Sequence, residues 1–351
     1  MIISGADRRT AAAMLRCVLG PVSLAYGAAV AVRNFLYDTG LLKSHKLPVP
    51  VVSIGNITTG GTGKTPLVIW MCRYLTGKGV RCAILTRGYK TAGQEDADEP
   101  ALLAKSCPGV GVVVNPDRLA AAQKAIEQFG AQILILDDGF QHRRIRRDLN
   151  ILAADATCPF GYGKLLPAGL LREHLRGLAR ADAVVISRFD QAQPDRIEEI
   201  EKTIQKYAGQ IPVAHSSHRQ SHGLDCAGKK LPIEYFKDKK LFVFCGIGNP
   251  QAFVHCLKQQ GMNIVGSRFF NDHHAYCLQD IEEIAALAVA RGAEIAICTQ
   301  KDWVKTALLC RQNAKPAFSC MVMELDFTGN ADKITALAER LIESVVSQKK
   351  Q

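Results

Sequence analysis

A glycine-rich stretch that ends in lysine and threonine carries the strongest chemical signal in the sequence. It reads SIGNITTGGTGKTP over residues 53–66, directly after an apolar run and at the start of a helical pattern. Glycines let backbone N–H groups close around phosphate oxygens, a lysine here can reach the β- and γ-phosphates, and the threonine hydroxyl can bind Mg²⁺. The sequence therefore predicts a nucleotide-binding loop made by Thr58, Thr59, Gly60, Gly61, Thr62, Gly63, Lys64 and Thr65.

The spacing of this loop departs from the strict G-x-x-x-x-G-K-[ST] pattern. Thr58 stands where that pattern has its first glycine. The alternative is a glycine-rich turn with a chance Gly-Lys-Thr. The order of strand, glycines, Lys-Thr and helix favours nucleotide binding.

Two adjacent carboxylates end a second apolar run. Asp137 and Asp138 follow residues 133–136 and precede a glycine. A nucleotide site of this kind needs a second Mg²⁺ ligand at the end of a neighbouring strand, so Thr65, Asp137 and Asp138 form the predicted metal set. Either aspartate can be the direct ligand, and a simple Asp-Gly turn is the alternative.

The balance of charge favours an anionic partner. The 351 residues include 44 Lys and Arg against 33 Asp and Glu, a net charge of +11. Nucleotides, phosphorylated small molecules, nucleic acid and acidic membranes all fit this charge. The basic run 141–147, which includes His142, follows the acidic pair and has Phe140 as its one neighbouring aromatic residue. Because RNA recognition relies on stacking aromatics, we rank a phosphate or structural role above nucleic acid, which we do not expect as a partner.

Cysteine and histidine patterns give weaker signals. The twelve cysteines include no C-x-x-C pair, which favours a reducing compartment over a disulfide scaffold. His215, His218 and His222 allow a zinc hypothesis, but their irregular spacing favours a polar linker over residues 211–232.

The N-terminal region combines an apolar centre with basic flanks. Residues 17–32 are uncharged but contain Gly20, Pro21 and Gly27, and a bilayer span needs about 20 apolar residues. The composition suits a helix lying in an anionic membrane interface. A helical hairpin packed on the protein's own core is the alternative.

The elements that must position these residues alternate between strand and helix. Expected strands cover 49–54, 82–86, 110–114, 133–136, 149–153 and 183–187, then 241–244, 263–267, 295–299 and 320–327. Expected helices cover 66–75, 118–129, 250–260, 278–291 and 331–346. This alternation predicts an α/β protein with mostly parallel sheets in two units.

Several further motifs occur in order along the chain and together carry a family resemblance. They are the 53–66 stretch, Arg87-Gly88-Tyr89, Asp98-Glu99-Pro100, Asp117-Arg118, the DDGFQH run at 137–142, Pro167-Ala168-Gly169-x-Leu171-Arg172-Glu173, Asp272-His273-His274-x-Tyr276 and Thr299-x-Lys301-Asp302. From about residue 50 to 302 this pattern resembles the tetraacyldisaccharide 4'-kinase family of Gram-negative bacteria. The threonine at position 58 belongs to that family's own pattern.

The resemblance implies a reaction and an architecture. The reaction is ATP- and Mg²⁺-dependent transfer of the γ-phosphoryl group to the 4'-hydroxyl of a tetraacylated disaccharide 1-phosphate in lipid A synthesis. The architecture is two α/β/α domains, the first P-loop NTPase-like, joined by a two-stranded ribbon near 211–222 and 318–327. We expect five regions: an N-terminal membrane-associating helical segment (1–47), a kinase domain (48–210), a linker strand region (211–232), a second α/β domain (233–317), and a return linker strand with a C-terminal helix (318–351).

An acceptor with acyl chains favours the interfacial hypothesis for the N-terminal segment. The resemblance implies a peripheral or monotopic enzyme on the cytoplasmic face of the inner membrane. The partners we expect are the acylated lipid and an anionic membrane surface, with no obligate protein partner.

The resemblance also assigns roles to individual residues. It implies that Asp98 is the base for the acceptor hydroxyl and that His273 or His274 pairs with it. The resemblance leaves open which of the two histidines this is. Lys64 and Asp138 complete the expected catalytic set. Arg118, His142, Arg172 and Glu173 are the expected substrate-binding residues, with Glu173 either orienting Arg172 or binding the sugar. The expected site spans a cleft that closes on ATP.

Two other classes of protein remain as alternatives. One is a nucleotide-switch ATPase or partner-binding protein with no lipid acceptor. The other is a basic RNA-binding protein, which would bind oligonucleotides with a steep dependence on salt.

Overall fold

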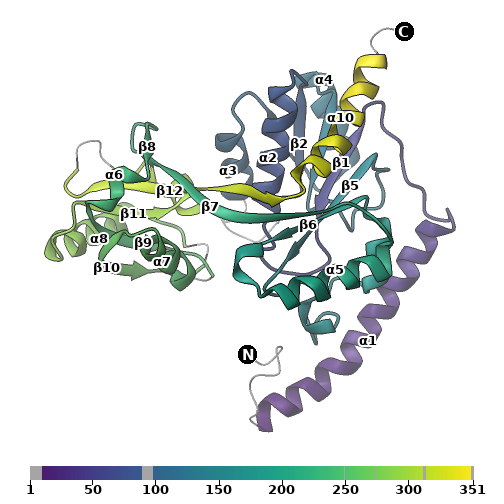
Figure 1. Ribbon diagram of the computed structural model, residues 1–351, viewed down its shortest axis with the longest axis horizontal. Helices are drawn as coiled ribbons and strands as arrows, with labels where there is room; N and C mark the ends of the chain where they lie inside the picture. Colours follow the sequence, from purple (N-terminus) through teal and green to yellow (C-terminus); the bar gives the residue numbers. More distant parts are fainter. Residues whose placement is uncertain (1–9, 89–97, 249, 273, 311–313, 349–351) are drawn as a thin grey trace. The chain divides into compact units, whose positions relative to one another are not determined.

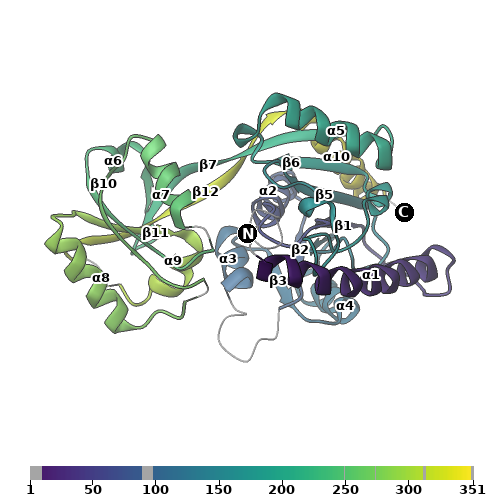
Figure 2. The ribbon, with the colours of Figure 1, turned by 90° about the horizontal axis from the view of Figure 1, so that it is seen from below.

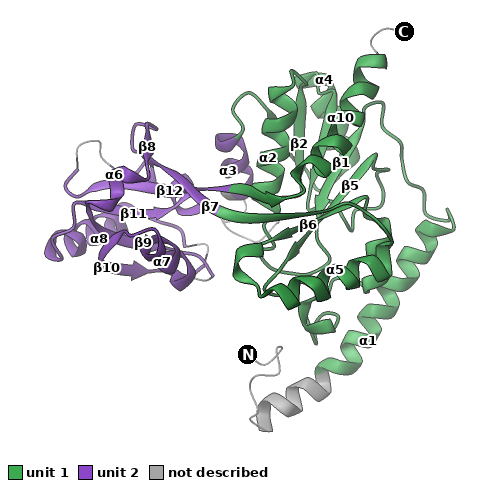
Figure 3. Ribbon diagram, in the orientation of Figure 1, with its two compact units in different colours: residues 1–87, 107–218, 325–351 green, residues 88–106, 219–324 purple. Residues whose placement is uncertain are grey.

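The computed structural model describes residues 10–88, 98–248, 250–272, 274–310 and 314–348 (Figure 1). The chain divides into two compact units, coloured separately in Figure 3. Unit 1 comprises residues 1–87, 107–218 and 325–351, and unit 2 comprises residues 88–106 and 219–324.

Unit 1 is built on a parallel sheet with the strand order β7-β6-β5-β1-β4-β2-β3. The strands are β1 (Val51–Gly55), β2 (Cys82–Thr86), β3 (Gly111–Val114), β4 (Ile133–Asp137), β5 (Leu149–Asp155), β6 (Ala183–Ser187) and β7 (Val213–Asp225). Every residue of β1, β2, β4, β5 and β6 is buried. Continuous burial is the pattern of parallel strands covered on both faces, which explains why these strands are predominantly apolar rather than alternating.

The helices of unit 1 follow the strands as crossover connections or lie at the ends of the chain. They are α1 (Thr10–Asp38), α2 (Lys64–Gly77), α4 (Arg118–Phe129), α5 (Pro194–Ala208) and α10 (Ala331–Gln348), with a 3₁₀ helix, η3, at Leu175–Arg180. Asp117 caps α4 by accepting hydrogen bonds from the amides of Leu119 and Ala120, and Gly130 ends it in the left-handed region.

Unit 2 has a smaller sheet with the order β10-β9-β11-β12. Its strands are β9 (Lys240–Cys245), β10 (Asn263–Phe269), β11 (Ile295–Thr299) and the first part of β12 (Ala317–Gly329), all paired in parallel, while β8 (Lys230–Pro232) pairs antiparallel with the end of β7. Its helices are α3 (Asp98–Ser106), α6 (Glu234–Lys237), α7 (Pro250–Gln259), α8 (Leu278–Ala290) and α9 (Gln300–Thr306).

Two long strands continue from one unit into the other. β7 and β12 are neighbours in the sheet, and the boundary between the units falls inside each of them. They form the two-stranded ribbon expected near 211–222 and 318–327. The region expected as a linker strand, 211–232, holds β7 and β8. β7 alternates more and less exposed residues along its length, although its sequence is mostly polar.

The compact units do not coincide with the five contiguous regions expected from the sequence. Residues 98–106, expected within 48–210, group with unit 2 because α3 packs on α9 there. The Lys105 ammonium donates to the Val304 carbonyl at 3.4 Å, and the Gln300 amide donates to the Ser106 hydroxyl at 3.3 Å. The helices α3, α5, α6 and α9 were not expected.

The N-terminal region forms one helix, α1, which runs along the side of unit 1 in Figures 1 and 2. The alternative of a hairpin is wrong, because the helix continues through Pro21 without a turn. Among the described residues, none of the helices combines the length and apolar character needed to cross a bilayer.

Candidate active site

The glycine-rich loop lies between β1 and α2, at the carboxyl end of the central strand. Gly63 immediately precedes α2 with φ +81°, and Gly60 has φ +110°. Both are conformations that glycine adopts without strain. Inside the loop, the Asn56 amide donates to the Thr62 hydroxyl at 2.9 Å. The loop therefore leads directly into a helix N-terminus, the arrangement that binds phosphate.

Lys64 and Arg172 converge on one carboxylate. Lys64 Nζ lies 3.3 Å from Asp138 Oδ1, and Arg172 contacts the two oxygens of Asp138 at 2.9 and 2.8 Å. Burial alone would raise the pKa of Asp138, but the charges and hydrogen bonds of Lys64 and Arg172 hold it below its usual value. Asp138 is thus ionised at neutral pH, and its two cationic partners hold it at the carboxyl end of β4.

Asp137, the other member of the acidic pair, is buried at the end of β4. Its Oδ2 accepts from the Thr86 hydroxyl at 3.2 Å. Arg118 is buried beside it and donates to the carbonyls of Asp137 and Asn115 at 3.4 and 2.9 Å. These contacts fix the backbone where β4 ends.

Thr65, Asp137 and Asp138 supply hydroxyl and carboxylate oxygens, the hard donors that Mg²⁺ prefers. Thr65 is the second residue of α2, and the two aspartates end or follow β4, which pairs directly with β1. The donor chemistry at these neighbouring strand ends fits a magnesium ion.

The segment that carries Arg172 pairs directly with the phosphate loop. Thr58 and Leu171 form an antiparallel bridge, the Thr59 amide donates to the Leu170 carbonyl at 2.7 Å, and the Arg172 amide donates to the Ile57 carbonyl at 2.7 Å. The backbones of Thr58 and Thr59 therefore belong to this pairing. Gly60 to Thr65 form the part of the loop that turns into α2.

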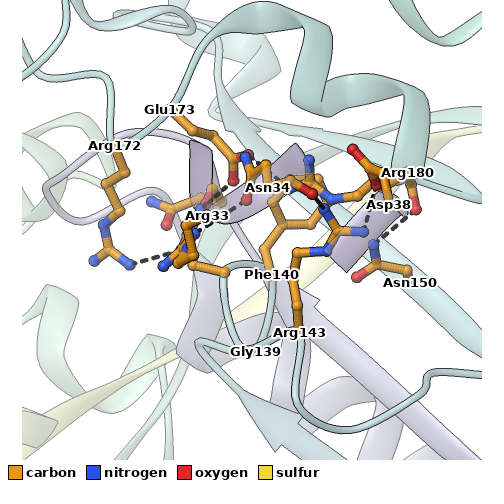
Figure 4. A network of polar contacts seen from close by, with 12 residues as sticks. Arg33, Asn34, Asp38, Gly139, Phe140, Arg143, Asn150, Arg172, Glu173 and Arg180 are labelled. Atoms are coloured by element: carbon orange, nitrogen blue, oxygen red, sulfur yellow. Dashed lines mark hydrogen bonds and ion pairs between the residues drawn. The ribbon is translucent and has the colours of Figure 1, made fainter. Parts of the chain in front are cut away.

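Glu173 lies completely buried at the centre of a polar network (Figure 4). Its carboxylate accepts from Arg180 at 2.7 Å, from the Gln141 amide at 3.0 Å and from the Asn34 amide at 3.2 Å. Gln141 Oε1 in turn accepts from Arg172 at 3.2 Å. Glu173 is thus linked to the Arg172 side chain through Gln141.

His142 belongs to the basic run 141–147. Its Nε2 is buried without a hydrogen-bond partner. Burial, then the charges of Arg118, Arg147 and Arg144, lower the pKa of His142 to about 4. The imidazole is therefore neutral at physiological pH.

Sequence reasoning missed the residues that support the phosphate loop from the neighbouring strands. The Ser187 hydroxyl donates to the Thr62 carbonyl at 2.9 Å, and Arg188 donates to the Gly61 carbonyl at 2.9 Å and pairs with Asp155. His218 on β7 packs so closely that a Cβ on Gly63 would lie 2.8 Å from its Nε2. Polar residues at the end of the expected strand 183–187 were the available signal for the first two.

The three histidines considered for zinc have separate environments. His215 contacts Glu201 and stacks on Phe189, and His222 contacts Ser221. Within the described parts of the chain, no group of three or more His, Cys, Asp and Glu side chains is arranged to hold a metal ion.

The remaining predicted residues belong to unit 2. Asp98 begins α3, but its side chain, like all of His273, lies outside the described part of the structure. His274 Nε2 contacts Asp280 Oδ2 at 3.0 Å, and its ring stacks on Phe270. Asp272 pairs with Lys301 at 3.1 Å, and buried Asp302 accepts from the Gly246 amide and the Tyr276 hydroxyl. The structure thus joins the motifs around residues 272–276 and 299–302 within one unit.

The fold and loop of unit 1 define the class of P-loop nucleotide-binding α/β proteins. A family model described as tetraacyldisaccharide-1-P 4'-kinase matches residues 15–342. Tetraacyldisaccharide 4'-kinase of Pelobacter propionicus is 37% identical over 332 residues, 90% of each chain, and that of Anaeromyxobacter dehalogenans strain 2CP-C is 38% identical over 297 residues, 80% of this chain and 78% of its own. A crystal structure of LpxK from Aquifex aeolicus in complex with ATP is 31% identical with a TM-score of 0.74, covering 93% of this chain and 99% of its own. The chain belongs to the tetraacyldisaccharide 4'-kinase family.

Proposed function

We propose that this chain transfers the γ-phosphoryl group of ATP to the 4'-hydroxyl of a tetraacylated glucosamine disaccharide 1-phosphate, a step of lipid A biosynthesis. The observation that carries the proposal is the convergence of Lys64 and Arg172 on Asp138 beside the phosphate loop. Family membership supplies the acceptor.

The residues of unit 1 provide the nucleotide half of this reaction. The loop and the N-terminus of α2 hold the phosphates, and Lys64 moves from Asp138 to the developing negative charge when ATP binds. Thr65 and one or both aspartates would hold Mg²⁺, which neutralises phosphate charge and so favours departure of ADP. Arg172 adds a second cation beside the same carboxylate.

The acceptor half requires a base for the sugar hydroxyl. Asp98, followed in α3 by Glu99 and Pro100, is the proposed base, and a histidine of the 272–274 segment is the proposed partner that orients it. Arg118, His142, Arg172 and Glu173 are proposed to act on the acceptor side, Glu173 by holding Arg172.

The outer side of α1 supports association with a membrane. Large apolar side chains are exposed there, including Leu24 at 77% and Phe35 at 62%. Such a surface suits burial at the headgroup boundary, with basic residues drawn to anionic lipid. The proposed location is the cytoplasmic face of the inner membrane, where both ATP and the acyl chains of the acceptor are accessible.

The test mixes purified protein, γ-labelled ATP, Mg²⁺ and the acylated disaccharide 1-phosphate in detergent. We expect label in the lipid at the 4' position, and none with Lys64→Ala. Release of labelled phosphate at the same rate with and without the acceptor would contradict the proposal and favour a nucleotide-switch ATPase.

A further inference from the structure

Two side chains on the inner side of α1 are hydrogen-bonded to one short segment of unit 1, while Arg143 bonds α1 near its end through the Asn34 carbonyl and Asp38. The buried or half-buried residues of α1 recur at helical spacing, with Ser23, Tyr26, Val30 and Asn34 on one face. The Ser23 hydroxyl donates to the Leu165 carbonyl at 2.8 Å, and the Tyr26 hydroxyl donates to the Arg172 carbonyl at 2.8 Å. Both acceptors belong to residues 165–173, which we call the arginine segment because it carries Arg172.

On its other side, the arginine segment is hydrogen-bonded to the phosphate loop. Residues 170–172 make the bridge and the two backbone hydrogen bonds to residues 57–59 described above. One strip of backbone therefore connects α1 to the loop expected to hold ATP. If α1 shifts relative to the rest of unit 1, the arginine segment must shift as well, because it is hydrogen-bonded to α1 on one side and to the phosphate loop on the other.

A chain of side-chain contacts also links α1 to the phosphate loop, and Figure 4 shows three of its members, Asn34, Glu173 and Arg172. Asn34 donates to Glu173, Gln141 donates to the other oxygen of Glu173, and Arg172 donates to Gln141. Arg172 then contacts Asp138, which contacts Lys64. Every member of this chain is at least partly buried, so water does not substitute freely for a lost contact.

Glu173 makes the contact with Asn34 consequential. A buried carboxylate needs its hydrogen-bond donors, and removing one leaves the charge under-satisfied. Arg180 and Gln141 would then reorganise around Glu173, and Gln141 is the residue that also holds Arg172. A change in the position of α1 would therefore change the position of the Arg172 guanidinium, which contacts Asp138.

We propose that Asn34 is a positioning residue. Through its hydrogen bond to Glu173, the packing of α1 on the rest of unit 1 determines the position of Arg172, and thereby the rate of phosphoryl transfer. The helix proposed to dock on the membrane is then also part of the support of the active site. This inference rests on the proposed kinase function and goes beyond it, because it assigns a catalytic consequence to contacts on the inner side of α1.

The experiment measures kinase activity and vesicle binding on the same full-length variants. Asn34→Leu keeps the side-chain size but removes the donor to Glu173, and Asn263→Leu makes the same change at an exposed position of β10. For Asn34→Leu we expect kcat with the detergent-dispersed lipid acceptor to fall about tenfold, as expected for a lost hydrogen bond to a buried charge. The KM for ATP should change less than threefold. Binding to phosphatidylethanolamine–phosphatidylglycerol vesicles should stay within the range of Asn263→Leu. The thermal midpoint should fall by about a few degrees, because buried Glu173 loses a donor, so kcat is compared at a temperature where both variants are folded.

Tyr26→Phe serves as a second variant that removes one hydroxyl and little packing. We expect its kcat to fall about threefold with vesicle binding unchanged. Wild-type kcat in both folded variants would overturn the inference, as would a loss of vesicle binding equal to the loss of activity. The wild-type protein in the same assay distinguishes a failure of the proposed role of Asn34 from a failure of the proposed kinase function. If the wild-type protein leaves the lipid unlabelled, the kinase function itself is contradicted.

Discussion

His218 gives unit 1 a measurable sensitivity to acid. Its imidazole packs beside Gly63 of the phosphate loop, and its Nε2 is buried without a hydrogen-bond partner. Burial and then the charge of Arg188 lower the pKa of His218 to about 4, although Asp155 and Asp190 act in the opposite direction. In the unfolded chain the pKa returns to about 6.5.

This difference in pKa sets the sign and size of the effect. As the pH falls below 6.5, the unfolded state binds a proton at His218 that the folded state does not, so the free energy of unfolding decreases until the folded pKa is reached. Between pH 7 and pH 5 this single group lowers the free energy of unfolding by about 2 kcal/mol. Above pH 7 it contributes almost no pH dependence.

The two tryptophans of the chain allow this to be measured on unit 1. Trp70 lies in α2 of unit 1 and Trp303 in α9 of unit 2. In a Trp303→Phe background, Trp70 fluorescence follows urea unfolding of unit 1 at pH 7 and pH 5. Between pH 7 and pH 5, the free energy of unfolding of the parent should fall by about 2 kcal/mol more than that of a His218→Gln variant, in which residue 218 cannot titrate. His142 titrates in both proteins and cancels. Equal losses in parent and variant would refute this account of His218.

Three further predictions concern the active site. Gly63→Ala should weaken ATP binding at least about tenfold by titration calorimetry, because an alanine at φ +81° is strained and its Cβ meets His218; unchanged affinity would contradict the geometry of the loop. Arg172→Lys should lower kcat about tenfold, because an ammonium cannot hold Asp138 and Gln141 together as the guanidinium does, and steady-state kinetics at wild-type values would argue against that role. Asp98→Ala should lower kcat about 100-fold or more with little change in the KM for ATP, and comparable losses in both would count against a general base.

The apolar runs made most of the fold predictable. The expected strands at 82–86, 183–187 and 295–299 and the expected helix at 118–129 have the bounds found in the structure. Such strands are buried on both faces, so their sequences are predominantly apolar and bounded by turn residues. The phosphate loop was predictable for a similar reason, because its glycines, lysine and threonine are needed at fixed spacing.

Elements with little apolar content could not be predicted in this way. β7 carries His215, His218 and His222 and reads as a linker, yet its pairing with β6 and β12 makes it a strand. α3 begins in an acidic stretch whose membership of unit 2 depends on packing against α9, a contact between residues about 200 positions apart. The network around Glu173 also depends on long-range contacts, because Asn34 lies 139 positions away in the sequence.

In the proposed reaction, the phosphate loop and the carboxylates that end β4 hold one metal-bound triphosphate. A crystal structure with Mn²⁺ and a non-hydrolysable ATP analogue tests it, because anomalous scattering locates the metal independently of the nucleotide. We expect one strong peak coordinated by the Thr65 hydroxyl and by Asp137 or Asp138, with the β- and γ-phosphates against residues 60–65. A nucleotide bound elsewhere on the chain, or a metal that none of these three side chains coordinates, would contradict it.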